Sequence, residues 1–163
     1  MQIDFQLDVF RAHPDDPAIV WRDQAYSYGW LLDAVSNQAE ALNTHSVKNG
    51  AVVSLEADFS PTSVAMLLAL VDRSAVLVPL TDTVREKKNE FREIGEVETI
   101  ITIGDDDRVA FESTGRAATH EHYRTLRERN HRGLVLFSSG STGASNGAVN
   151  DLSFLLNKFK VPR

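Results

Sequence analysis

The residues best suited to binding a ligand form one segment rich in serine, threonine and glycine, at residues 138–147. It reads Ser-Ser-Gly-Ser-Thr-Gly-Ala-Ser-Asn-Gly and directly follows an apolar run at residues 134–137. Glycines let backbone amides approach a ligand closely, and hydroxyl groups can donate hydrogen bonds to anionic oxygens. The segment therefore has the composition of a phosphate-binding loop, although a Ser/Gly loop that binds nothing fits the same residues.

We do not interpret this segment as a P-loop. In a P-loop the last glycine is followed by Lys and then Ser or Thr, whereas Gly147 is followed by Ala148 and Val149. We also do not interpret the segment as the nucleophile elbow of a hydrolase. Phosphate binding without a Walker lysine remains the working hypothesis.

Three other polar groups are interpreted as surface features. Residues 120–122, His-Glu-His, lack the i, i+4 histidine spacing of a zinc helix and are expected at a solvated helix end. The three aspartates at 105–107 lack the ligand spacing of a calcium loop and predict a polar turn. A third group, interleaved with glutamates, predicts an exposed helix face with i, i+4 pairs, and comprises Arg124, Arg127, Arg129 and Arg132.

These residues must be positioned by strands and helices that alternate along the chain. Short apolar runs bounded by turn residues predict strands at 18–21, 25–28, 51–55, 75–80, 99–103, 109–111 and 134–137. Apolar residues at helical spacing and capping signals predict helices from Ser27, at 61–73 after Ser60, at 83–94 from a Thr83–Glu86 capping box, and at 120–130. This alternation predicts an α/β fold with a mostly parallel β-sheet and helices on both faces.

Composition excludes several classes of protein. The 163 residues are 42% hydrophobic and 25% charged, which is typical of one folded α/β domain spanning residues 1–163. A net charge of -6 argues against a nucleic-acid partner, and no apolar run approaches the ~20 residues of a membrane span. Without cysteine there are no disulfides or thiolate metal sites, and we expect a cytoplasmic location with no bound metal.

The segment at residues 134–147 resembles the signature loop of the adenylate-forming (AMP-binding) superfamily of acyl-CoA synthetases and adenylation domains. The family pattern has an apolar strand followed by Ser/Thr-Ser-Gly-Ser/Thr-Thr-Gly-x-Pro-Lys-Gly, and residues 138–143 and Gly147 match it. Residues 16–20, 26–28 and 50–80 are similar to the family's N-terminal opening and its next two strand–helix units. The resemblance thus implies the N-terminal subdomain of the adenylate-forming synthetase fold.

The resemblance also implies an activity and a set of ligands. In this family ATP and a carboxylic acid give an acyl-adenylate and pyrophosphate, and the thiol of CoA or a carrier then takes the acyl group. The parent enzyme would use ATP with Mg²⁺, and the resemblance implies an acyl-CoA ligase. The residues implied to hold the β- and γ-phosphates are Ser138, Ser139, Gly140, Ser141, Thr142 and Gly143.

The chain departs from the family at positions that matter for catalysis. The Pro-Lys of the pattern is Ser145-Asn146 here, and a histidine common soon after the loop is replaced by Asn150. Loss of a charged donor to phosphate weakens binding by about 1.5–3 kcal/mol unless a neighbour replaces it. The family's later motifs, including its catalytic lysine, do not follow, so no catalytic residue is assigned and the chain is expected to be an inactive N-terminal fragment.

Two alternatives to a catalytic fragment remain open. A degenerate module could hold nucleotide or phosphate without turnover, as Asn146 in place of lysine suggests. A fragment could also self-associate as a homo-oligomer through a sheet edge and helix faces that the rest of the enzyme would cover.

Overall fold

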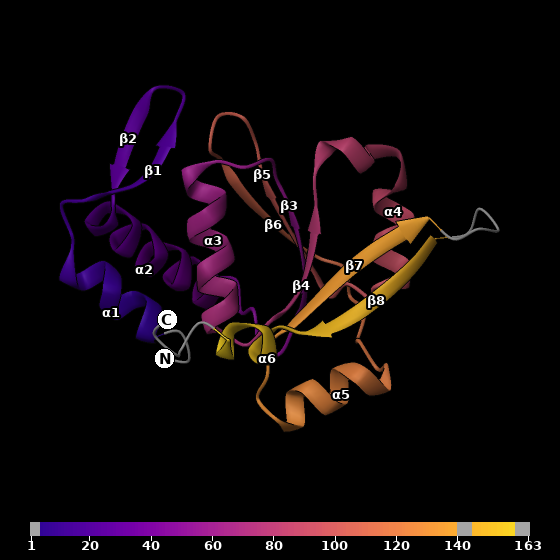
Figure 1. Ribbon diagram of the computed structural model, residues 1–163. Helices are drawn as coiled ribbons and strands as arrows, with labels where there is room; N and C mark the ends of the chain where they lie inside the picture. The colour runs from indigo at the N-terminus through magenta and orange to yellow at the C-terminus, as the bar shows by residue number, and fades with distance from the viewer. Residues whose placement is uncertain (1–3, 140–144, 159–163) are drawn as a thin grey trace.

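A six-stranded sheet forms the centre of the computed structural model, which describes residues 4–139 and 145–158. Its strand order is β6-β5-β3-β4-β7-β8 (Figure 1). The four inner strands run parallel and are β3 (Val52–Glu56), β4 (Val76–Leu80), β5 (Thr99–Ile103) and β7 (Gly133–Ser139). The two edge strands, β6 (Val109–Ser113) and β8 (Ser145–Asp151), pair antiparallel with β5 and β7. The predicted mostly parallel sheet is confirmed, while β8 is a strand that the sequence did not predict.

Helices cover both faces of the sheet, as predicted (Figure 1). One face packs on α1 (Asp4–Ala12), α2 (Tyr28–Thr44), α3 (Pro61–Asp72) and α6 (Leu152–Asn157). The other face packs on α4 (Lys88–Ile94) and α5 (Glu121–Glu128). Within the described ranges, no helix is long and apolar enough to cross a membrane.

A small hairpin precedes the sheet and leads into α2. Strands β1 (Pro17–Trp21) and β2 (Gln24–Ser27) pair antiparallel around Arg22 and Asp23, both of which have positive φ, as a two-residue type I′ turn requires. The Ser27 hydroxyl accepts a hydrogen bond from the Trp30 amide and caps α2. The predicted hairpin and helix start are both confirmed.

Helix α3 begins as its sequence predicts. The Ser60 hydroxyl accepts a hydrogen bond from the Ser63 amide at 3.1 Å, and the Ser63 hydroxyl lies 2.7 Å from the Ser60 amide, which donates to it. Pro61 occupies the first helical position, where its missing N–H costs no hydrogen bond. These two serines therefore fix where the helix starts, at the carboxyl end of β3.

The segment between β4 and α4 differs from the prediction. Residues Asp82–Lys87 form a 3₁₀ helix, η1, and α4 begins only at Lys88. The predicted Thr83–Glu86 capping box is wrong, because the hydroxyls of Thr81 and Thr83 bond each other at 2.6 Å instead of capping the helix. The charged residues of η1 thus lie in a tight turn beside the carboxyl end of β4.

Candidate functional site

The two ends of the glycine-rich segment are brought together by the hairpin of β7 and β8. Ser138 pairs with Asn146 and Ser139 with Ser145 in the antiparallel register. Of the predicted site residues, Ser138 and Ser139 therefore lie in β7, and the Ser138 side chain is exposed. The other four predicted residues, Gly140, Ser141, Thr142 and Gly143, lie outside the described residues. We call the paired positions 138–139 and 145–146 the hairpin root.

The sequence of β7 explains why the hairpin packs as it does. Val135 and Phe137 point to the face covered by α4, whereas Leu136 is 49% exposed on the opposite face. Gly147 of β8 favours this packing, since a Cβ there would lie 3.2 Å from Phe137 and 3.4 Å from Ile94, in tight contact with both. The last glycine of the motif therefore lets helix α4 approach the strand closely.

Helix α4 contacts the hairpin root directly. The rings of Phe91 and Phe137 stack with their centroids 4.1 Å apart and nearly parallel. The Ser145 amide donates to Glu90 Oε1 at 3.4 Å, and Lys87 Nζ donates to Ser145 Oγ at 3.4 Å. These contacts bring a lysine that the sequence did not single out to the base of the glycine-rich segment.

A buried carboxylate fixes the position of α4 on the sheet. Glu56, at the end of β3, is only 3% exposed. Arg92 donates to both of its oxygens, from Nε at 2.6 Å and from Nη2 at 2.7 Å, and the Ser54 hydroxyl donates at 3.2 Å. The hydrogen bonds to Glu56 raise the pKa of Arg92. In the sequence, Glu56 was recognisable only as a single acidic residue directly after an apolar strand. Nothing in the residue spacing linked it to Arg92.

Two further cations of η1 and α4, Arg85 and Lys88, are also paired with carboxylates. Lys88 Nζ lies 3.0 Å from Asp82 and 3.6 Å from Glu56, and Arg85 also bonds Asp82. Hydrogen bonds from Arg85 and then Lys88 lower the pKa of Asp82. Lys87 differs from these residues, because no ion pair within 4 Å involves it among the residues that the structure describes.

Ser145 also occupies the serine position of a Gly-x-Ser-x-Gly pattern at residues 143–147. In a nucleophile elbow this serine lies in a sharp turn between a strand and a helix. Here Ser145 is the first residue of a strand and is buried, and its hydroxyl contacts Lys87 rather than a histidine. The structure therefore supports the interpretation that this segment is not a nucleophile elbow.

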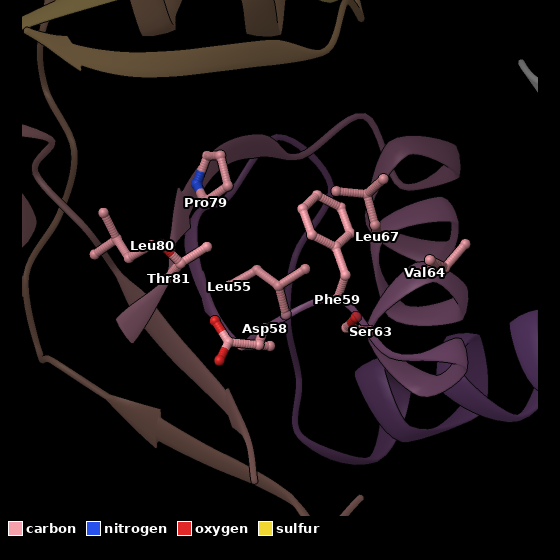
Figure 2. Close-up of a pocket in the computed structure, with 10 residues that line it drawn as sticks. Leu55, Asp58, Phe59, Ser63, Val64, Leu67, Pro79, Leu80 and Thr81 are labelled. Atoms are coloured by element: carbon pink, nitrogen blue, oxygen red, sulfur yellow. The ribbon is translucent and has the colours of Figure 1, made fainter. Parts of the chain in front are cut away.

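A separate apolar cavity of about 100 Å³ lies at the carboxyl ends of β3 and β4, against the first turns of α3 (Figure 2). Phe59 and Leu67 line one side and Pro79 the other, and Phe59 is 78% exposed. Asp58 supplies the only carboxylate among the lining residues. The cavity suits an apolar group and offers no cation for a phosphate.

The three polar groups that the sequence placed on the surface lie outside the hairpin root. His120 caps α5 through its ring nitrogen, and the aspartates at 105–107 lie in an exposed turn, as predicted. The predicted exposed arginine face is wrong at Arg132, which is 4% exposed and donates to Val71 O, whereas Arg127 is exposed and donates to the carbonyls of Gly50 and Ala118. Over residues 4–139 and 145–158 there is no group of three or more His, Cys, Asp or Glu that could hold a metal ion.

A mostly parallel sheet with a serine- and glycine-rich segment at the carboxyl end of one strand is typical of nucleotide-binding α/β proteins. The family model described as AMP-binding enzyme matches residues 7–92, just over half of the chain. The chain therefore belongs to the AMP-binding enzyme family. The matched residues include β3, α3, β4 and most of α4, and they end before the hairpin.

Relatives and solved structures agree with this assignment. The chain is 22% identical over 168 residues to vanchrobactin synthetase VabF of Vibrio anguillarum. This alignment covers 93% of this chain and 6% of VabF. The N-terminal subdomain of Klebsiella oxytoca NpsA in space group P21 has a TM-score of 0.71 at 20% identity, over 96% of this chain and 43% of that one. The artificially fused NpsA-ThdA adenylation–PCP di-domain NRPS from K. oxytoca has a TM-score of 0.69 at 21% identity, over 91% and 32%. The chain thus spans less than half of the length of each of these relatives.

Proposed function

We propose that this chain is the front part of an ATP-dependent carboxylic acid-activating ligase and holds the triphosphate of ATP at the β7–β8 hairpin. The observation that carries the proposal is the position of the glycine-rich segment, between two paired strands at the carboxyl end of the sheet in a chain of the AMP-binding enzyme family. The parent reaction joins a carboxylate to the α-phosphate of ATP and releases pyrophosphate, and a thiol then takes the acyl group.

The residues present fit a polyphosphate. The hydroxyls of Ser138, Ser139, Ser141 and Thr142 are the proposed donors, and the proposed role of Gly140 and Gly143 is to keep backbone amides accessible. The exposed Ser138 side chain can donate to anionic oxygens, and the Lys87 ammonium beside Ser145 approaches the hairpin root from its other face. Mg²⁺ is expected to accompany ATP in the parent enzyme, and we assign it no ligand among the described residues. The role of these donors is to bind and orient the phosphates and to stabilise charge on the departing pyrophosphate.

The acceptor thiol belongs to the same proposal. We infer CoA or a carrier thiol, and the relatives favour the carrier, because one is a synthetase and another an adenylation–PCP di-domain. A cytoplasmic location, where ATP is supplied, completes the proposal. The catalytic residues lie outside this chain in our assignment, so the chain alone is proposed to bind ATP without turnover.

Isothermal titration of the chain with ATP tests the phosphate site. Ser141→Ala and Thr142→Val should each lower ATP affinity by roughly tenfold, since a hydrogen bond to a charged group contributes about 1.5–3 kcal/mol. Ser36→Ala, on the exposed side of α2, is the matched control and should leave affinity unchanged. ATP binding that is equal in all four proteins would refute the assignment of the hairpin as the phosphate site.

A second measurement tests whether the chain is catalytic. We expect no carboxylate-dependent exchange of pyrophosphate into ATP, because the chain supplies phosphate donors but no assigned catalytic residue. Exchange above the background of a protein-free reaction would overturn the proposed inactivity and leave the ATP site in place.

The alternative of a self-associating module is favoured by one specific observation. Leu136, Phe154 and Leu155 are between 47% and 57% exposed, on β7 and on α6, which follows β8. Large apolar side chains exposed on a surface are typical of an interaction site when they form a contiguous patch. Sedimentation over a wide concentration range tests this alternative, and a monomer throughout would contradict it.

A further inference from the structure

Lys87 occupies an unusual electrostatic position beside the hairpin root. Its Nζ donates to Ser145 Oγ at 3.4 Å, and Ser145 pairs with Ser139 at the end of the β7–β8 ladder. Arg85, Lys88 and Arg92 all have carboxylate partners within 4 Å. Within the described parts of the chain, Lys87 has none, so its charge is not neutralised by a direct ion pair.

The backbone that carries Lys87 is held firmly in place. One residue further along, Lys88 reaches the buried Glu56 and also Asp82, and Arg92 binds Glu56 through two hydrogen bonds. Phe91 stacks on Phe137 of β7. Because these contacts fix α4 relative to the hairpin, the backbone of Lys87 is held where its side chain reaches Ser145.

The hairpin root lacks a cation of its own. Asn146 stands where the resembled pattern has lysine, and its side chain is exposed. Ser145, one position earlier, is buried against α4 and contacts Lys87. Neighbouring residues of a strand face opposite sides, so Lys87 approaches the root from the α4 side and Asn146 lies on the other.

We propose that Lys87 is the phosphate-pairing cation of this chain, supplying from the end of η1, just before α4, the charge that Asn146 does not supply from β8. This inference rests on the proposed function, and it names the residue that makes the site electropositive. A lysine ammonium is a compact point charge that pairs well with phosphate oxygens. Lys87 is a binding and positioning residue here, and no covalent step is assigned to it.

Glu90 provides an opposing charge at the same place. Its Oε1 accepts a hydrogen bond from the Ser145 amide, so a carboxylate lies on the same side of the root as Lys87. A phosphate bound there is attracted by Lys87 and repelled by Glu90. The proposal therefore predicts effects of opposite sign for the two residues, which a purely structural role would not produce.

The test is titration with ATP of the full chain and four variants, with thermal unfolding to verify that each is folded. Lys87→Gln should lower ATP affinity by roughly tenfold, and Lys87→Arg, which keeps the charge, should stay within about threefold of the parent. Glu90→Gln, which keeps the acceptor for the Ser145 amide, should raise affinity by about two- to fivefold. Lys48→Gln makes the same charge change at the opposite end of the sheet, and should have little effect.

The outcomes separate this inference from the proposed function. If the parent chain binds ATP and Thr142→Val weakens binding, but Lys87→Gln matches Lys48→Gln, the hairpin site stands and the role of Lys87 is refuted. If the parent chain does not bind ATP at all, the proposed function fails and the inference fails with it. Loss on Lys87→Gln, retention on Lys87→Arg and gain on Glu90→Gln together support the inference.

Discussion

Helices α3 and α4 cover opposite faces of the same sheet by different physical means. Helix α3 is apolar on most sides, and Met66 and Leu70 are completely buried against β3, β4 and α2. Helix α4 has one buried apolar residue, Phe91, and is otherwise held by the ion pair between Arg92 and Glu56. Apolar burial is non-directional, whereas a two-point ion pair fixes both the position and the orientation of a helix.

This difference explains which helix can carry a binding group. A helix whose surface is nearly all buried has no room for charged side chains. Helix α4 and the adjoining η1 present their cations at the carboxyl end of the sheet, beside the hairpin root. Because α4 is held by an ion pair and buries only one apolar residue, charged side chains on it and on η1 can lie where the proposed phosphates bind.

Breaking the anchor of α4 should give the largest effect on stability. Arg92→Met removes both hydrogen bonds that Arg92 donates to the buried Glu56, which keeps only Lys88 at 3.6 Å and the Ser54 hydroxyl, and we expect a loss of about 4 kcal/mol in the free energy of unfolding, measured by urea denaturation. The double variant Glu56→Leu with Arg92→Met removes both charges and should recover most of the loss. A double variant no more stable than Arg92→Met would show that the ion pair is not the anchor.

A cavity in α3 should give the next largest effect. Leu70→Ala removes a completely buried side chain, with an expected loss of roughly 3 kcal/mol in urea denaturation. Phe59→Ala, on an exposed residue beside the same helix, is the control and should cost less than about 1 kcal/mol. Equal losses in the two variants would contradict the view that α3 is held by burial in the core.

The contrast between the two helices also marks what the sequence could predict. Helix α3 was predicted to within one residue at each end, because its cap and its apolar spacing are local signals. The start of α4 and the pair between Glu56 and Arg92 were not predicted, since they depend on contacts across 36 positions in the chain.

The hairpin shows the same limit of local signals. Strand β8 begins with Ser145, Asn146 and Gly147, which have weak strand propensity, and it is stabilised by pairing with β7. The glycine-rich motif predicted which residues form the candidate phosphate site. It did not predict the contact between Lys87 and Ser145, because only the tertiary packing of α4 brings these two residues together. The roles assigned to residues 138–143 stay a prediction.

The far end of α4 gives a smaller effect that depends on pH. The Tyr123 hydroxyl donates to the carbonyl of Gly95, which caps α4, at 2.9 Å. Burial, and then the charge of Glu96, raises the pKa of Tyr123 to about 12, from about 10 in an unfolded chain. The folded state therefore holds this proton more tightly, and the resulting stability is complete below about pH 10 and is lost as the pH rises towards 12.

Tyr123→Phe tests this contact. We expect a loss of about 1 kcal/mol below pH 10 from the missing hydrogen bond, and a weaker fall in stability between about pH 10 and 12 than in the parent. Urea denaturation across that pH range measures both. If the parent and the variant fall in parallel, ionisation of Tyr123 is not the source of the pH dependence.

The smallest expected effects distinguish how the two helices begin. Ser60→Ala removes the cap of α3 and should cost about 1 kcal/mol, because the Ser63 amide loses its acceptor. Thr83→Ala should change the free energy of unfolding by less than about 0.5 kcal/mol, since the Thr83 hydroxyl bonds only Thr81 among the contacts of the described chain. Thermal and urea unfolding of both variants measure the difference. A cost for Thr83→Ala as large as that for Ser60→Ala would mean that η1 needs a side-chain cap in solution, and that α4 does not rely on the Glu56 anchor alone.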